Sequence, residues 1–213
     1  MSPILQALVY LVVLVIGVFA WLHYRLPKAA AEDAARHTRM FESAEIAGEV
    51  EWVEERKAFV FEHAGRSYML RYASEGPSFV TEDGLVDAST TWACLETKVN
   101  SKGAFSLHRK GAMQRFIGTA GFSKSIPSGD PRFDEHFMIV ADTPDIASEY
   151  FSDDECRRAA RALFGLGYTG ISMRAGIISL CWIPFSNGSS GEDGLFLKAG
   201  LDSMKILAGN PNA

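Results

Sequence analysis

The segment EVEWVEERKAFVFEHAGRSYMLRY (49–72) decides the fold class of this chain. Within it are three short runs that either alternate apolar with polar residues or are rich in valine and aromatic residues, and both patterns are typical of strands. The three runs are Glu49–Glu54, Ala58–His63 and Ser67–Tyr72. The short connections at Arg56-Lys57 and Ala64-Gly65-Arg66 are typical of tight turns, so the segment predicts an antiparallel meander.

Strand and helix signals continue downstream of this segment. Further strand-like runs are Thr91–Val99, Ala104–His108, Phe133–Ala141, Tyr168–Met173 and Gly176–Ile183. The last two runs predict a hairpin around Arg174-Ala175. Helices are predicted to start at Thr143-Pro144 and at Ser152, where the residues Ser-Asp-Asp-Glu have capping-box spacing, and a last helix is predicted over Leu195–Leu207.

An uncharged apolar stretch, ILQALVYLVVLVIGVFAWL (4–22), lies near the N-terminus. A helix rises about 1.5 Å per residue, so its 19 residues match a hydrocarbon core roughly 30 Å thick. We therefore predict a transmembrane helix that places residues 4–22 in the lipid bilayer. Two alternatives stay open, namely a cleaved signal peptide and a helix buried in the protein core.

The distribution of positive charge predicts the orientation of this helix. Arg25, Lys28, Arg36 and Arg39 follow the apolar stretch, whereas only the terminal amine precedes it. Because positive residues favour the cytoplasmic side, the prediction is a single-pass membrane protein whose soluble domain lies in the cytoplasm. An extracytoplasmic domain is the alternative.

These patterns divide the chain into four parts. They are a transmembrane anchor over 1–28, a juxtamembrane helix over 29–48, a soluble domain over 49–185, and a linker with a C-terminal helix over 186–213. The second part is rich in Ala, Glu and Arg, which favour helix, and Gly48 is its predicted C-cap. The predicted fold class is α+β, with an N-terminal transmembrane helix followed by a mainly antiparallel sheet and two or three helices.

Charge and cysteine content narrow the function classes. The formal net charge of -5 argues against a general nucleic-acid binder, because such domains are normally basic. The three cysteines, Cys94, Cys156 and Cys181, are far apart, odd in number and without a CxxC pair. This spacing fits neither a disulfide framework nor a zinc site, so we expect reduced, buried thiols, and no cofactor or metal is predicted.

Three residues around the sequence Asp-Pro-Arg-Phe-Asp-Glu-His could carry chemistry: Asp130, Asp134 and His136. On a strand, Asp134 and His136 would point to the same face, where a carboxylate and an imidazole could form a metal or acid–base site. No third metal ligand occurs at a recognisable spacing, and no GxSxG motif supplies a nucleophile. We therefore assign no catalytic residue, and these three form an alternative site.

A basic stretch offers a second candidate site. Arg109, Lys110, Arg115 and Lys124 lie between His108 and Arg132, a window in which Asp130 is the one acidic residue. Such cations can bind anionic lipid headgroups, with each contributing about 1 kcal/mol near the membrane surface. The alternative is a solvated surface, which is the usual role of short charge runs.

The stretches AFSLHRKG (104–111), SGDPRFD (128–134) and FMIV (137–140), with the hairpin over 171–182, resemble a family of proteins. The family consists of uncharacterised bacterial single-span membrane proteins, carrying a domain of unknown function, that share a GDPxFDxxF motif. The resemblance implies a bacterial, membrane-tethered setting and supplies no catalytic residues.

The sequence therefore predicts a membrane-tethered binding or scaffolding domain without enzymatic activity. The expected partners are the bilayer, anionic lipid headgroups or a membrane protein complex, and not nucleic acid. The alternative is a membrane-bound hydrolase or metal-dependent enzyme that uses Asp134 and His136.

Overall fold

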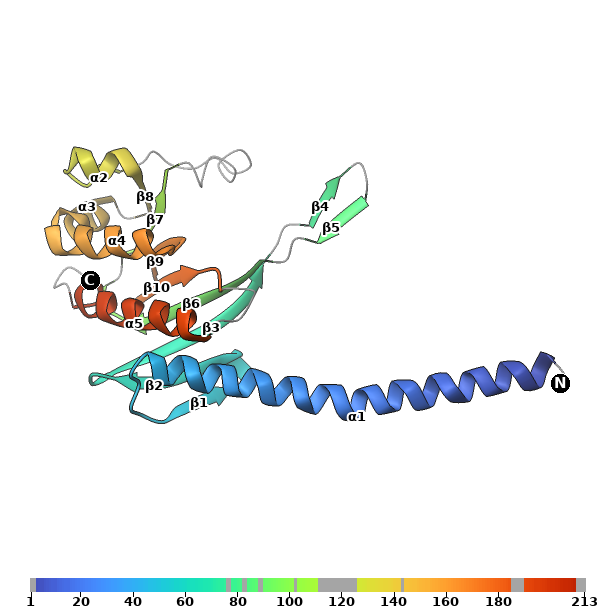
Figure 1. Cartoon of the computed structure of the whole chain (residues 1–213). Helices are drawn as coiled ribbons and strands as arrows, with labels where there is room; N and C mark the ends of the chain where they lie inside the picture. The colour runs from blue at the N-terminus through green and yellow to red at the C-terminus, as the bar shows by residue number, and fades with distance from the viewer. Residues whose placement is uncertain are drawn as a thin grey trace.

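Eight strands pair into one antiparallel sheet in the order β1-β2-β3-β6-β10-β9-β7-β8 (Figure 1). The structure, a computed structural model, describes residues 3–75, 78–81, 84–87, 90–101, 103–110, 126–142, 144–184 and 190–209. The strands of this sheet are β1 (Val50–Val53), β2 (Ala58–His63), β3 (Arg66–Glu75), β6 (Thr90–Lys98), β7 (Phe105–Arg109), β8 (Phe137–Ala141), β9 (Gly170–Arg174) and β10 (Ile177–Trp182). A separate hairpin consists of β4 (Ser78–Thr81) and β5 (Gly84–Asp87). The helices are α1 (Pro3–Ser43), the short 3₁₀ helix η1 (Glu54–Arg56), α2 (Pro131–His136), α3 (Pro144–Ser152), α4 (Asp154–Leu166) and α5 (Ser190–Leu207).

Two hairpins of the sheet have the tight turns that the sequence predicts. Ala64 and Gly65 join β2 to β3 with φ values of 51° and 73°, and Ala175 and Gly176 join β9 to β10 with φ values of 52° and 72°. Two consecutive positive φ values match the right-handed twist of the paired strands. Glycine adopts such a φ without strain, but alanine does so at a steric penalty.

Replacing Ala175 by asparagine is expected to raise the free energy of unfolding by about 0.5–1 kcal/mol, because Asn-Gly is the favoured pair in such turns. Urea titration of the wild-type chain and the variant measures the change. The same substitution at Ala199, inside α5, serves as the control and should lower stability, because asparagine is a weak helix former. A destabilised Ala175→Asn variant would contradict this account of the turn.

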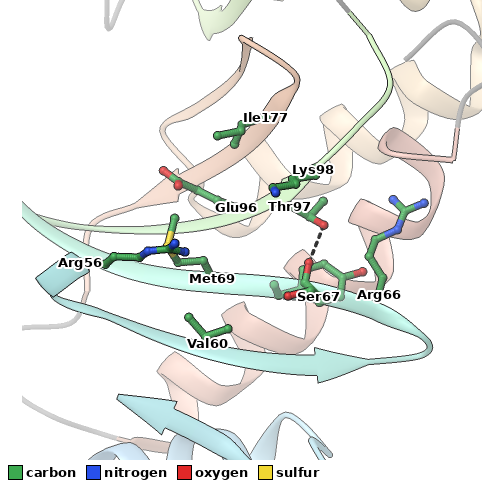
Figure 2. Close-up of a pocket in the computed structure, with 10 residues that line it drawn as sticks. Arg56, Val60, Arg66, Ser67, Met69, Glu96, Thr97, Lys98 and Ile177 are labelled. Atoms are coloured by element: carbon green, nitrogen blue, oxygen red, sulfur yellow. Dashed lines mark hydrogen bonds between the residues drawn. The ribbon is translucent and has the colours of Figure 1, made fainter. Parts of the chain in front are cut away.

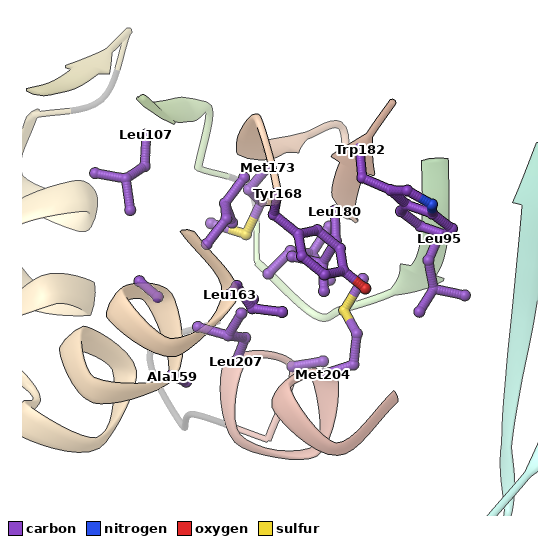
Figure 3. Packing of buried hydrophobic residues seen from close by; sticks show 14 of the residues in the cluster. Leu95, Leu107, Ala159, Leu163, Tyr168, Met173, Leu180, Trp182, Met204 and Leu207 are labelled. Atoms are coloured by element: carbon purple, nitrogen blue, oxygen red, sulfur yellow. The ribbon is translucent and has the colours of Figure 1, made fainter. Parts of the chain in front are cut away.

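The core lies between one face of the sheet and the helices (Figure 3). Alternate residues of the central strands are fully buried, including Leu95 on β6 and Leu180 and Trp182 on β10. Against them pack Leu163 of α4 and Met204 of α5, which are also fully buried. The period of two in the strands therefore assigns one face of the sheet to the core and leaves the other face free of these contacts.

Among the described side chains of α1, those that pack on this core belong to its C-terminal end. Met40 and Phe41 are buried, and Arg36 forms an ion pair of 2.9 Å with Asp193 of α5. The helix is continuous over 41 residues, so it joins the predicted anchor and the predicted juxtamembrane helix into one element. It ends at Ser43 and not at Gly48 as expected.

The predicted transmembrane helix at 4–22 is wrong. Among the helices that the structure describes, none is long and apolar enough to cross a membrane. The described apolar side chains of this stretch, Tyr10, Val13–Ile16 and Val18, are 50–76% exposed, but they cover only about two turns, whereas a span needs about 20 residues. The predictions of a single-pass membrane location, of a cytoplasmic or extracytoplasmic side, and of a bilayer as partner through 4–22 lose their basis with it.

The strand predicted over Phe133–Ala141 is a helix and a strand. The side chain of Asp130 accepts a hydrogen bond of 2.9 Å from the backbone N–H of Arg132, and Pro131 occupies the first turn, so α2 starts here. The helix ends at His136, and β8 begins at Phe137. Phe133 and Phe137, with ring centroids 4.7 Å apart, both enter the core.

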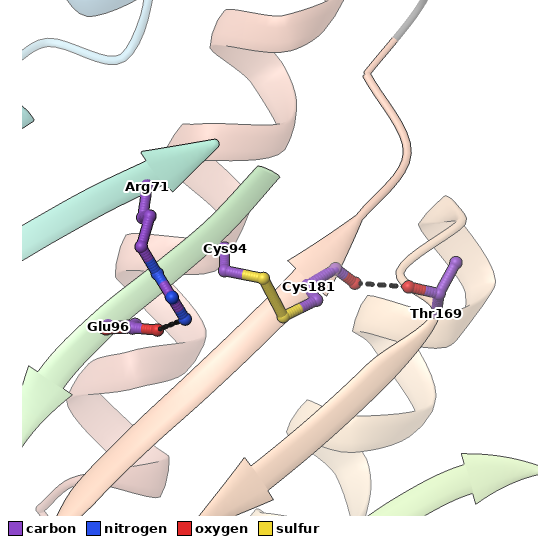
Figure 4. Close-up of a disulfide and its surroundings, with 5 residues drawn as sticks. All are labelled: Arg71, Cys94, Glu96, Thr169 and Cys181. Carbon is purple, nitrogen blue, oxygen red and sulfur yellow. Dashed lines mark hydrogen bonds and ion pairs between the residues drawn. A yellow bond between two sulfur atoms is a disulfide. The ribbon is translucent and has the colours of Figure 1, made fainter. Parts of the chain in front are cut away.

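The expectation of three reduced thiols is also wrong, because Cys94 and Cys181 form a disulfide (Figure 4). The two residues are direct partners in the register of β6 and β10, with their Cα atoms 4.2 Å apart. They are 87 residues apart in sequence, so their proximity depends on a strand pairing that no local pattern reveals. Cys156 is buried and lies outside this disulfide, as expected.

Helix α4 follows the predicted capping with a small shift, whereas Thr143, the predicted N-cap of α3, lies outside the described residues. The side chain of Asp153, and not Ser152, caps α4 by accepting a hydrogen bond of 2.8 Å from the N–H of Glu155. Gly167 ends α4 with φ of 114°, a conformation that favours glycine. Helix α5 starts at Ser190, five residues before the predicted Leu195.

Candidate anion-binding site

The second face of the sheet carries the candidate site. On β2, β3, β6, β10 and β9, the residues that alternate with the buried ones point away from the core, and no helix of the described ranges covers them. The strand register aligns Val60, Met69, Glu96, Ser179 and Ser172 in one row across these five strands. Since neighbouring strands lie about 4.8 Å apart, residues from distant parts of the chain meet on this face.

Two adjoining hollows shape this face. The first has a volume of about 290 Å³ and is drawn in Figure 2. The second has a volume of about 480 Å³. They share Arg56, Met69, Glu96 and Ile177 in their linings, so they form one continuous depression. Its combined size is within the range of small-molecule sites.

Positive charge dominates the lining of the depression. Five cations line it, and Glu96 is the one carboxylate among the lining residues. The cations are Arg56, Arg66, Arg71, Lys98 and Arg174. The apolar side chains of Val60, Met69 and Ile177, each half-buried, lie among them. We call these five cations and three apolar residues the cationic face; Arg66 borders it from the start of β3, because its position alternates with Ser67 and Met69 and has the parity of the buried Tyr68.

Only one of the five cations is neutralised. Arg71 donates a hydrogen bond of 2.8 Å from its Nη2 to Oε1 of Glu96, which removes the single negative charge of the lining. Within the described ranges, Arg56, Arg66, Lys98 and Arg174 form no ion pair. The cationic face therefore has an uncompensated positive charge.

Arg66, which lines the first hollow at the start of β3, has an unsatisfied donor. Its Nη1 atom is buried and has no hydrogen-bond partner in the described part of the chain. A buried polar atom without a partner is uncommon in folded proteins, because it loses its hydration and gains no bond in return. An acceptor from a ligand would satisfy it. Beside it, Oγ1 of Thr97 donates a bond of 2.7 Å to the carbonyl of Ser67, which ties β6 to β3 at this end of the hollow (Figure 2).

The residues of the alternative site do not converge. Asp130 caps α2 and forms ion pairs with Arg161 and Arg157, and Asp134 accepts hydrogen bonds of 2.9 and 3.2 Å from the N–H of Ser128. Because Asp134 and His136 are two residues apart on a helix, and not on a strand, their side chains point about 200° apart. Among the described residues, no group of three or more His, Cys, Asp or Glu could hold a metal ion.

Replacing Asp130 by asparagine is expected to remove an acid-sensitive part of the stability. Partial desolvation raises the pKa of Asp130, but hydrogen bonds from Arg161 and from the N–H groups of Arg132 and Phe133 outweigh it, so the pKa lies below its usual value. A carboxyl with a depressed folded pKa stabilises the fold above its unfolded pKa, near pH 4, and this contribution disappears as pH falls through the folded pKa.

The unfolding temperature of wild type and Asp130→Asn between pH 3 and 7 measures this contribution. Asparagine still caps the helix, so the comparison isolates the charge. The wild-type advantage should be present at neutral pH and disappear in acid, whereas Glu135→Gln on the same helix should leave the pH profile unchanged. An advantage of the same size at all pH values would contradict the ionic explanation.

The basic stretch is only partly described. Nη2 of Arg109 donates a bond of 3.2 Å to the carbonyl of Phe164, and Nζ of Lys110 donates to the carbonyl of Asp134. Both side chains thus bind main-chain carbonyls of neighbouring helices. Arg115 and Lys124 lie outside the described residues. A lipid-headgroup site at these four residues remains a prediction.

Comparisons with known proteins leave the family of the chain open. No family model and no curated protein matches the sequence. Among solved structures, the chain is similar to the crystal structure of the mycobacterial trehalose monomycolate transport factor A, TtfA, at 12% identity and a TM-score of 0.45. The match covers 80% of this chain and 95% of that one. At this level, no property of TtfA is carried over to this chain.

Proposed function

We propose that this chain is a binding protein whose cationic face takes a ligand with an anionic group, a phosphate or a carboxylate, and an apolar portion. The observation that carries the proposal is a set of four cations around a depression that have no ion-pair partner within the described part of the chain, one of them with a buried guanidinium nitrogen that has no hydrogen-bond partner there. Hydrogen bonds between a guanidinium and an anionic oxygen are about twice as strong as neutral ones.

The apolar residues of the cationic face are the reason for proposing an apolar portion in the ligand. Val60, Met69 and Ile177 lie between the cations and keep part of their surface exposed. Covering apolar surface stabilises a complex by about 25 cal/mol per Å². A free inorganic anion would use only the cations, so an amphiphilic anion fits the whole depression better.

The lining supports binding better than catalysis. Its hydroxyl groups belong to Ser67, Tyr68, Thr97, Ser172 and Ser179, and no histidine is among the lining residues. Its single carboxylate, that of Glu96, is held by Arg71. A nucleophile with an adjacent free base is thus not found among these side chains. No observation favours the alternative enzyme built on Asp134 and His136, so it is not proposed.

Isothermal titration calorimetry with dodecyl phosphate, below its critical micelle concentration, tests the proposal. We expect saturable binding of dodecyl phosphate, and weaker binding of both inorganic phosphate and the uncharged dodecyl maltoside. The double variant Arg66→Gln with Lys98→Gln should bind dodecyl phosphate at least tenfold more weakly, since a hydrogen bond to a charged group contributes about 1.5–3 kcal/mol.

The matched control is Arg132→Gln with Arg158→Gln. It removes the same charge from exposed positions of α2 and α4 and should leave the affinity unchanged. Equal weakening in both double variants would show that only net charge matters. That result, or no binding by the wild-type chain, would overturn the proposal.

A further inference from the structure

A groove separate from the two hollows of the cationic face lies on the core side of the sheet, at the end of the sheet opposite β8. It has a volume of about 820 Å³ and lies between the C-terminal part of α1 and the strands β1 and β2. Helix α1 contributes Asp33, Ala34, His37, Thr38, Phe41 and Glu42, and the strands contribute Val50, Trp52 and Phe59. The groove and the cationic face share no lining residue, so they are independent sites.

Aromatic rings form one wall of the groove. Phe59 is at the centre, with ring centroids of His37, Trp52 and Phe41 at 4.7, 4.8 and 5.2 Å. Trp52 is 44% exposed, and its Nε1 donates a hydrogen bond of 2.6 Å to Oε2 of Glu54. A large ring that is fixed in place and exposed is an anchor for apolar side chains of a partner.

The charges of the groove are negative. Asp33 and Glu42 line it, and no lysine or arginine is among its lining residues. Burial lowers the pKa of His37, although Asp33 acts in the opposite direction, so the imidazole adds no positive charge at neutral pH. Arg36, which precedes His37 on the helix, is paired with Asp193. The groove therefore complements a cation and repels an anion.

The groove opens at a free edge of the sheet. Among the described strands, β1 pairs with β2 alone, so one row of its backbone N–H and C=O groups is unpaired. The inward side chains of β1, Val50 and Trp52, line the groove, while Glu51 is exposed on the other face. Such an edge is a template for an added strand.

We propose that an extended, basic segment of a partner protein adds to the edge of β1, with apolar side chains in the groove. Its backbone pairs with the free groups of Val50–Val53. Its valine- or leucine-like side chains contact Trp52 and Phe59. Its lysines or arginines reach Asp33 and Glu42 on the groove side and Glu51 on the other side. Each property of the proposed segment rests on a separate observation. Its extended backbone matches the free edge of β1, its apolar side chains match the aromatic wall, and its positive charge matches the acidic residues of the groove.

Fluorescence anisotropy with the labelled peptide Lys-Val-Val-Lys-Val-Val-Lys tests the proposal on the full chain. The peptide places lysines on both faces of a strand, and Glu-Val-Val-Glu-Val-Val-Glu is its charge-reversed match. We expect the basic peptide to bind at least tenfold more tightly than the acidic one. Asp33→Asn with Glu42→Gln should weaken the basic peptide at least tenfold, whereas Glu155→Gln with Asp202→Asn, at exposed positions of α4 and α5, should not.

Amide hydrogen exchange shows whether the peptide forms a strand. Binding should slow exchange at residues 50–53, because the added strand accepts from amides that face the free edge. Binding without slower exchange at β1 would overturn the strand addition, and equal binding of both peptides or of neither would overturn the proposal as a whole. Protection of β1 that rises with protein concentration without peptide would assign the edge to a second copy of this chain and also overturn it.

Discussion

Replacing Trp182 by alanine is expected to lower the free energy of unfolding by about 3–5 kcal/mol. Trp182 is 1% exposed, and its ring lies 5.3 Å from that of Tyr168 and 6.3 Å from that of Phe196. The side chain fills the space between β10 and α5, so its loss removes buried apolar area and leaves a cavity that the sheet and the helix cannot close. Urea titration monitored by far-ultraviolet circular dichroism measures the change.

Trp182→Phe is the matched control for this substitution. It keeps an aromatic ring against Tyr168 and removes only the outer part of the indole, whose Nε1 is buried without a hydrogen-bond partner in the described part of the chain. The phenylalanine variant should therefore lose less than half of the stability that the alanine variant loses. A loss below about 1 kcal/mol for alanine would be far outside the usual range for such residues and would show that Trp182 does not hold β10 and α5 together.

Removing the disulfide through Cys94→Ala with Cys181→Ala is expected to lower stability by about 2–4 kcal/mol. The bond joins residues 87 positions apart, so it restricts a long loop in the unfolded chain. Thermal unfolding with and without dithiothreitol gives the effect in two ways, because reductant should lower the unfolding temperature of the wild type toward that of the double variant. The double variant should not respond to reductant.

A wild-type unfolding temperature that dithiothreitol leaves unchanged would contradict a stabilising disulfide. An equal response of the double variant would assign the effect to Cys156, the buried cysteine outside this disulfide. The pair also lies beside Arg71 on the cationic face, because Arg71 is the register partner of Cys94 (Figure 4). Calorimetry of the double variant with dodecyl phosphate therefore shows whether the bond affects the site as well as the fold.

Local signals in the sequence predicted local structure well. Ala64-Gly65-Arg66 and Arg174-Ala175 marked the two tight hairpins, and the second turn lies one residue later than predicted, at Ala175-Gly176, where glycine tolerates the positive φ. The acidic residues at Ser152–Glu155 marked the start of α4 within two residues, because their side chains satisfy free N–H groups. In both cases the physical cause acts within four residues.

The sequence was less informative where two local signals compete. Asp130-Pro131 predicted a turn, and the apolar residues from Phe133 to Val140 predicted a strand. The structure resolves the conflict by using the first signal as a helix start and leaving the strand to begin at Phe137. The pairing of Asp134 with His136 on one strand face disappeared with that change, and the alternative site depended on it.

The candidate site could not be predicted because it depends on strand order. Arg56, Arg66, Lys98 and Arg174 come from η1, β3, β6 and β9, and nothing in their spacing relates them. The period of two places Lys98 and Arg174 on the outward face but gives Arg66 the parity of the buried Tyr68. The cations come together because β6 pairs with both β3 and β10. The disulfide depends on the same pairing and was missed for the same reason.

The transmembrane prediction shows the limit of composition as a guide to structure. It used only the apolar character of 4–22 and treated residues 29–48 as a separate helix. The structure continues the helix to Ser43, where contacts such as those of Met40 and Phe41 hold it on the domain. Met40 and Phe41 lie outside 4–22, so the hydropathy of that stretch could not predict that the same helix packs on the domain.

Helix α1 also sets a distance. It leaves the domain as an arm, with the N-terminus far from the sheet (Figure 1). A rise of 1.5 Å per residue from Arg36, which is fixed to α5, to Tyr10 gives a separation of about 40 Å. Because the helix is uninterrupted, a molecule that contacts the exposed side chains near Tyr10 is held at about this distance from Arg36. The chain can therefore keep two binding partners a fixed distance apart.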